Sequence, residues 1–126
     1  MKYLFLDDER WPNQVTWIVI GNVGAQGIPW TKARSFYEAT ELVRECGFPE
    51  VISFDHDLGV EWSNKENKYV VSKTGMDFAK WLVEYDMETN LMPDNFTFTV
   101  HSKNEQGKIN IESLLNNYIK FKKKQK

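Results

Sequence analysis

The apolar positions along the chain fall into two patterns, short runs and helical repeats. Residues 2–6 and 51–54 are short apolar runs, typical of parallel strands buried on both faces, and residues 96–100 alternate Phe, Thr, Phe, Thr and Val. From about 36 to 46 and from about 76 to 87, apolar residues recur at the three- and four-residue spacing of a helix. Strands that alternate with helices predict an α/β fold with a mainly parallel sheet.

Capping signals indicate where the helices begin. Ser35 with Glu38, and Thr74 with Asp77, have the spacing of a capping box, in which each end of the pair bonds a backbone N–H of the first turn. A third amphipathic pattern predicts a last helix from about Asn110. These signals predict three helices, one after each of three strands.

Other stretches have no helical period. Residues 15–20 are β-branched and aromatic and are expected to be extended, and residues 30–34 are expected to form a short strand. Residues 59–73 are polar without a clear period, which predicts a long loop that acts as a mobile lid over the strand ends. We expect one domain over residues 1–119, followed by a basic tail over residues 120–126.

Composition limits the class of protein. A chain of 126 residues with 41% hydrophobic residues can form one core, and no apolar run approaches the ~20 residues of a membrane span. We find no signal peptide and expect a cytoplasmic protein, which a single cysteine fits. Cys46 lies on the apolar side of the first helix and is expected to be a buried thiol.

Charge is unevenly distributed. The net charge is −2, although the tail is rich in lysine, so the body of the chain is acidic. An acidic body argues against a broad nucleic-acid-binding face. The tail could contact nucleic acid or could fray in solvent. Its lysines are Lys120, Lys122, Lys123, Lys124 and Lys126.

Acidic residues follow two of the predicted strands. Asp7 and Asp8 come directly after the first strand, and Asp55 follows the strand at 51–54. The carboxyl ends of parallel strands open on one side of a sheet, so these side chains should converge there. Carboxylates about 4 Å apart repel by about 4 kcal/mol per pair at an effective dielectric constant of 20. The three acids therefore predict a Mg²⁺ or Mn²⁺ site, unless they are protonated or simply cap helices and face solvent.

Both histidines of the chain also fall at strand ends. His56 follows Asp55, and His101 ends the strand at 96–100. A histidine titrates near neutral pH and can act as a general base or acid, so the pair could move a proton into and out of a bound phosphate ester. Alternatively, each histidine holds a backbone turn by hydrogen bonding.

Further polar residues near these strand ends could bind a phosphate. Lys103 and Asn104 lie between the last strand and the last helix, where backbone N–H groups can hold an anion. Arg10 could contact a phosphate or pair with a neighbouring acid. Trp11 and Trp62 could stack on a base or fill the core.

Residues 6–10, with the sequence Leu-Asp-Asp-Glu-Arg, resemble the acidic pair of response-regulator receiver domains. Asp55 stands where a receiver has its phosphate-accepting aspartate, and Ser102 stands near the Ser/Thr that ends the fourth strand. We find no lysine-bearing fifth strand after Ser102. The resemblance implies a receiver-like (flavodoxin-like) three-layer α/β fold with a mainly parallel central sheet that lacks the usual fifth strand.

A closer resemblance is to the cyclic-phosphate processing receiver-like domains. It is carried by residues 54–59, Phe-Asp-His-Asp-Leu-Gly, by Thr74-Gly75, and by residues 100–104, Val-His-Ser-Lys-Asn, with Gly107 after them. The resemblance implies metal-assisted hydrolysis of a cyclic phosphate on a nucleotide or an RNA end. Together with the chemistry of the strand ends, we expect Asp7, Asp8 and Asp55 as metal ligands, Asp55, His56 and His101 in catalysis, and Arg10, Ser102, Lys103 and Asn104 on the phosphate.

Two other functions fit the same residues. A degenerate receiver would bind a protein or nucleotide partner without catalysis. A stand-alone phospho-acceptor would use Asp55 as a nucleophile. Turnover of a cyclic phosphate and labelling by a small phosphodonor would separate these functions from hydrolysis.

Overall fold

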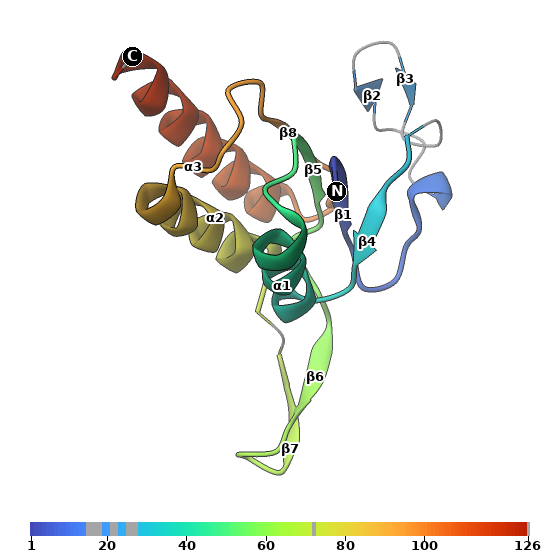
Figure 1. Ribbon diagram of the computed structural model, residues 1–126. Helices are drawn as coiled ribbons and strands as arrows, with labels where there is room; N and C mark the ends of the chain where they lie inside the picture. The colour runs from blue at the N-terminus through green and yellow to red at the C-terminus, as the bar shows by residue number, and fades with distance from the viewer. Residues whose placement is uncertain (15–18, 21–22, 25–27, 72, 126) are drawn as a thin grey trace.

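A parallel sheet forms the centre of the molecule. The computed structural model describes residues 1–14, 19–20, 23–24, 28–71 and 73–125. The four sheet strands are β1 (Tyr3–Leu6), β4 (Thr31–Ala33), β5 (Val51–Phe54) and β8 (Thr97–Val100), in the order β4-β1-β5-β8 and all parallel (Figure 1). The predicted parallel sheet is confirmed, and no fifth parallel strand follows β8 in the described part of the chain.

Most of the predicted extended segment at 15–20 lies outside the described residues. What is described there is β2 (Val19–Ile20), which pairs antiparallel with β3 (Val23–Gly24). The short strand predicted at 30–34 is β4.

The helices are α1 (Phe36–Cys46), α2 (Gly75–Thr89) and α3 (Glu105–Lys124). The Ser35 side chain accepts the Glu38 backbone N–H, and Thr74 and Asp77 form both halves of a capping box. The prediction that the last helix begins at Asn110 is wrong. Asn104 caps α3, and the first turn was missed because it is polar. At its other end α3 continues to Lys124, so most of the basic tail is helical.

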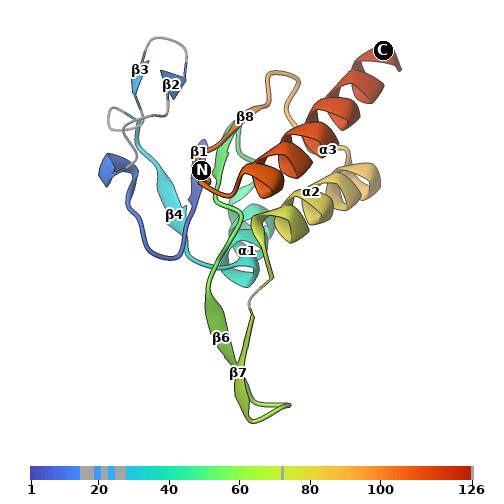
Figure 2. The same cartoon turned by 180° about the vertical axis from the view of Figure 1, so that it is seen from behind.

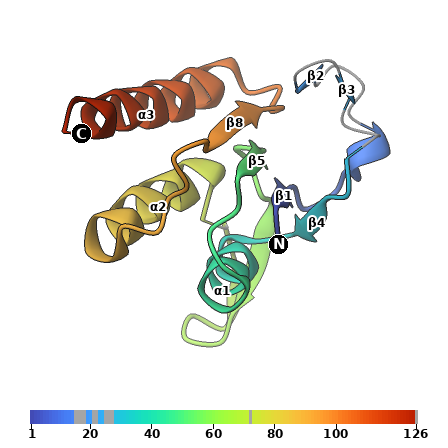
Figure 3. The same ribbon diagram turned by 45° about the horizontal axis from the view of Figure 1, so that its top comes forward.

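One face of the sheet packs against all three helices. Leu4, Ile52 and Phe54 belong to the same buried cluster as residues of α1, α2 and α3. In Figure 3 the helices lie on this side of the sheet and beside β8. The alternate residue Phe5 points to the opposite face, where Trp30 packs on it edge to face. The implied three-layer arrangement, with helices on both faces, is not seen in the described residues: their helices cover one face of the sheet, and side chains bury the centre of the other.

The prediction of a loop at 59–73 is wrong. The segment forms an antiparallel hairpin of β6 (Val60–Ser63) and β7 (Lys68–Val71), with Asn67 in the left-handed region. The four residues between the strands contain no glycine, so the loop lacks the usual sequence signal of a hairpin turn of this length. In Figures 1 and 2 the hairpin projects away from the sheet, so it does not cover the strand ends as a lid would.

Cys46 is exposed, so the prediction of a buried thiol is wrong. It is the last residue of α1, directly before Gly47, which ends the helix with φ of 93°. Among the described residues, no helix has the length and apolar character needed to span a bilayer.

Candidate functional site

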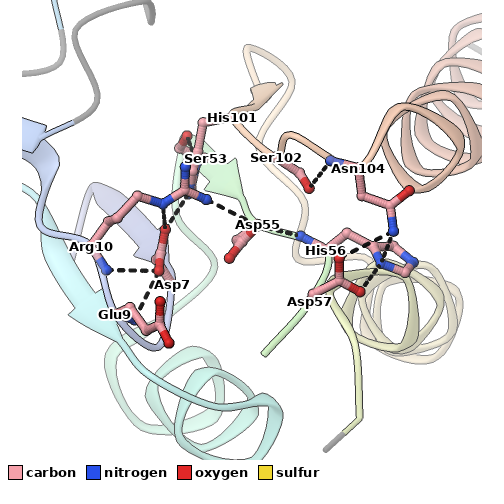
Figure 4. A network of polar contacts seen from close by, with 10 residues as sticks. All are labelled: Asp7, Glu9, Arg10, Ser53, Asp55, His56, Asp57, His101, Ser102 and Asn104. Carbon is pink, nitrogen blue, oxygen red and sulfur yellow. Dashed lines mark hydrogen bonds and ion pairs between the residues drawn. The ribbon is translucent and has the colours of Figure 1, made fainter. Parts of the chain in front are cut away.

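The carboxyl ends of β1, β5 and β8 hold the polar cluster shown in Figure 4. Asp55 N–H donates to Leu6 O, and His101 N–H donates to Phe54 O, both at 2.9 Å. The parallel ladder thus continues one residue past each strand. This fixes the backbone of Asp55 and His101 beside Asp7, so the predicted convergence of strand ends holds for these three residues.

His101 is completely buried and both ring nitrogens have partners. Nε2 lies 3.0 Å from Asp7 Oδ2, Nδ1 lies 2.7 Å from Ser53 Oγ, and the ring stacks on Phe5 with centroids 4.5 Å apart. A neutral imidazole that donates from Nε2 to the carboxylate and accepts the Ser53 hydroxyl satisfies every atom. These contacts fix the orientation of the ring and, through it, the Asp7 carboxylate.

Arg10 supplies a positive charge between the two buried acids. Its Nε lies 2.9 Å from Asp7 Oδ2, and its terminal nitrogen lies 3.3 Å from Asp55 Oδ1. The backbone N–H groups of Glu9 and Arg10 each donate to Asp7 Oδ1 at 2.9 Å. The sequence did not indicate that Arg10 bridges Asp7 and Asp55, because Asp55 is distant along the chain.

The two acids differ in their affinity for protons. Burial raises the pKa of Asp7, but hydrogen bonds from His101 and two backbone N–H groups, with the charge of Arg10, outweigh it and lower the pKa to about 2. Burial, followed by the negative charge of Asp7, raises the pKa of Asp55. Asp7 is therefore the acid that stays ionised, and Asp55 is the acid most easily influenced by an added cation.

The donor set at this point fits a divalent cation. Asp7, Asp55 and His101 each offer one ligand atom, and these atoms lie within 4.8 Å of one another. Two carboxylates and an imidazole suit Mn²⁺ or a related ion, and carboxylates alone also suit Mg²⁺. Asp8 lines the same cleft and lies against Gly59, where a Cβ would be 2.7 Å from Asp8 Oδ2. Burial raises the pKa of Asp8.

His56 forms a second group on the other side of Asp55. Its Nδ1 lies 2.9 Å from Asp57 Oδ1 and 3.3 Å from Asn104 Nδ2, which also donates to Asp57 Oδ2 at 3.1 Å. In Figure 4 this ring points toward the start of α3, away from His101. Hydrogen bonds from His56 and Asn104 lower the pKa of Asp57.

Two glycines allow the helices to approach this group. A Cβ on Gly75 would lie 1.9 Å from the Asp55 carbonyl oxygen, and a Cβ on Gly107 would lie 2.4 Å from His56 Cγ. Gly75 N–H also donates to His56 O at 2.8 Å. Sequence reasoning singled out these glycines only as turn and resemblance residues and missed their contacts with the site.

An open cleft of about 430 Å³ lies over the polar cluster. All four residues predicted to bind phosphate line it, as do the three predicted metal ligands. The two histidines border the cluster without lining the cleft. The lining residues are Asp7, Asp8, Glu9, Arg10, Asp55, Asp57, Gly59, Ser102, Lys103 and Asn104.

The fold and the acids at its carboxyl edge define a receiver-like α/β domain. The chain belongs to the family of cyclic-phosphate processing receiver domains, whose model matches residues 2–117. No curated protein and no solved structure matches the chain significantly. The family match confirms the resemblance to this family, and its range includes all the motifs that suggested it.

Proposed function

We propose that the cleft binds a divalent cation, Mg²⁺ or Mn²⁺, and opens a cyclic phosphodiester by adding water. The observation that carries the proposal is the placement of Asp7, Asp55 and His101 within ligand distance of one another, in a family described as processing cyclic phosphates. A nucleotide or an RNA end with a cyclic phosphate would be the substrate.

Asp7 and Asp55 would hold the cation, and Asp8, which lines the same cleft, would be a further ligand. A divalent ion there would neutralise charge on the phosphate and favour attack by water. Because both His101 nitrogens already have partners, we assign His101 the task of fixing the Asp7 carboxylate. Asp55 would enter catalysis through the cation.

His56 would transfer a proton during the ring opening. Water adds to phosphorus, one ring P–O bond breaks, the water gives up one proton and the leaving oxygen takes up one proton. Asp57, 2.9 Å from His56 Nδ1, would hold the Nδ1–H and leave Nε2 as the basic nitrogen. Which of the two protons His56 transfers depends on the direction from which the substrate enters.

Side chains at the starts of the last helix and of the first loop would bind the phosphate. Lys103 and Arg10 bring positive charge to a cleft that is otherwise acidic, and Ser102 and Asn104 bring hydrogen-bonding groups. The Ser102 hydroxyl already accepts the Asn104 N–H at 3.1 Å, so its O–H proton can point to the phosphate.

The test is a screen of 2′,3′-cyclic nucleotides, 3′,5′-cyclic nucleotides and cyclic-ended RNA, with and without Mg²⁺ or Mn²⁺. We expect metal-dependent ring opening that falls at least about 100-fold in Asp55→Asn and His56→Ala. Glu88→Gln, an exposed change of the same charge on α2, is the control and should keep parental turnover. Equal turnover in Asp55→Asn and the control, or none in the folded parent with metal, would overturn the proposal.

A further inference from the structure

Trp11 is an exposed indole directly beside the site. Half of its surface is accessible, although a tryptophan usually buries most of its area. Its backbone is fixed, because its N–H donates to Gln14 Oε1 at 2.7 Å and its carbonyl accepts Gln14 N–H at 2.9 Å. The ring is thus held at the surface by a short turn, η1 (Pro12–Gln14).

Two positive charges lie against this ring. Lys32 Nζ is 4.0 Å from the ring centroid, and Arg34 Cζ is 5.6 Å from it. Each contact is a cation–π interaction. Burial and the neighbouring Arg34 charge lower the pKa of Lys32, so an anion bound here would relieve the repulsion between the two cations.

This group borders the cleft on the side of β4. Lys32 pairs with Phe5 in the sheet register, and Asp7 N–H donates to Ala33 O, between the two cations. Trp11 follows Arg10, which contacts both buried acids. Most of the charged residues that line the cleft are acidic, so an incoming polyanion would meet a favourable charge on the side of Lys32 and Arg34.

We propose that Trp11, Lys32 and Arg34 form a subsite for single-stranded RNA, which binds the nucleotide on the 5′ side of a cyclic phosphate held in the cleft. The proposal rests on the proposed function for the identity of the end in the cleft. A base stacks on the indole, and its phosphate lies between the two cations. Such stacking tolerates any base, because every base has a π face. The subsite selects RNA ends over free cyclic mononucleotides.

The test measures the binding of a labelled RNA hexanucleotide that ends in a 3′-hydroxyl. Fluorescence anisotropy reports the dissociation constant at several salt concentrations. This probe has no cyclic phosphate, so its binding does not depend on hydrolysis. We expect Trp11→Ala to weaken binding at least about fivefold and Trp11→Phe to weaken it less. Arg34→Ala should reduce the slope of log affinity against log salt concentration by about the amount that one phosphate contact contributes.

Phe121→Ala is the matched control. Phe121 is as exposed as Trp11 and lies among the lysines of α3, so this variant reports binding by the basic tail. It should bind RNA like the parent. Three results would overturn the subsite. They are unchanged RNA binding in folded Trp11→Ala, a greater loss of RNA binding in Phe121→Ala than in Trp11→Ala, and no RNA binding by the parent. RNA binding through Trp11 without ring opening would instead overturn the proposed function alone.

Discussion

At the scale of single residues, Arg10 bridges the two buried acids through one guanidinium group. Its guanidinium lies 2.9 Å from Asp7 and 3.3 Å from Asp55, so it occupies the side of the carboxylates that a metal ion would approach. A bound divalent cation would take over this charge neutralisation. Arg10 would then be able to contact the phosphate. Metal binding and substrate binding would therefore be coupled through this side chain.

We therefore predict that Arg10→Ala binds Mg²⁺ more tightly than the parent. Without the guanidinium the two carboxylates repel each other, so the metal-free variant should melt at a lower temperature. Added metal should restore more stability, since stabilisation by a ligand grows with its affinity. Thermal melts over a series of Mg²⁺ concentrations would measure this. A smaller metal-induced shift than in the parent would show that Arg10 does not compete for the site.

At the scale of elements, the approach of α2 and α3 to the chain after β5 builds the site. Gly75 begins α2 against the Asp55 carbonyl oxygen, and Gly107 lies in the first turns of α3 against the His56 ring. In an exposed helix, Gly→Ala stabilises by about 1 kcal/mol. Here residues of the site occupy the space that a Cβ would need at both positions. Gly→Ala should therefore destabilise the fold at both.

The two glycines predict different outcomes. Gly75→Ala meets backbone 1.9 Å away, so we expect it to lower the free energy of unfolding by about 3 kcal/mol. Gly107→Ala meets a side chain that can rotate, so it should cost less stability but should displace His56 and reduce turnover. Denaturant unfolding and ring-opening rates of both variants would show the difference. An increase in stability in both would place the helices farther from the site than described here.

Another contact at this scale joins the far ends of the same helices. Asp86 on α2 accepts the Tyr118 hydroxyl at 2.5 Å, Lys122 Nζ at 2.6 Å and Met92 N–H at 2.8 Å. Burial raises the pKa of Asp86, but these hydrogen bonds outweigh it and lower the pKa below 3.8. These contacts of Asp86, which we call the Asp86 joint, therefore stabilise the fold above pH 3.8. Their contribution is lost as the pH falls through the lower pKa that Asp86 has in the folded state.

Asp86→Asn should lower the free energy of unfolding by about 2 kcal/mol at pH 7, because charge-assisted hydrogen bonds are lost. The difference from the parent should shrink as the pH falls below 3.8. Urea unfolding at pH 7 and at a pH below 3.8 would measure it. A difference that is constant over this range would mean that the carboxylate charge contributes nothing.

The sequence predicted elements whose signals are local. The strand at 51–54 and the capping box of Thr74 with Asp77 were identified from adjacent residues alone. The start of α3 was missed because its first turn has no apolar side chain. In the site, Asp7 and Asp55 followed from the rule for strand ends, but the bond from Ser53 to His101 depends on the register between β5 and β8.

At the scale of the whole molecule, the polar site and the Asp86 joint lie at different ends of α2 and α3. The acids and both histidines lie where these helices begin (Figure 4), and Asp86, Tyr118 and Lys122 lie in their later turns. In the described part of the chain, β8 is the edge strand of the parallel sheet and no fifth strand brings a lysine to the cleft. Under the proposed function, water attacks the phosphate and no phosphoryl group is transferred to Asp55.

The most direct test is the ³¹P NMR spectrum of cyclic-ended RNA incubated with the chain and Mg²⁺ in ¹⁸O-enriched water. We predict that the cyclic resonance is replaced by that of a phosphate monoester carrying one ¹⁸O, and that the mass of the quenched protein does not change. Asp55→Asn should leave the cyclic resonance in place. A cyclic resonance that persists with the folded parent and metal, or a phosphoryl adduct on Asp55, would contradict the account.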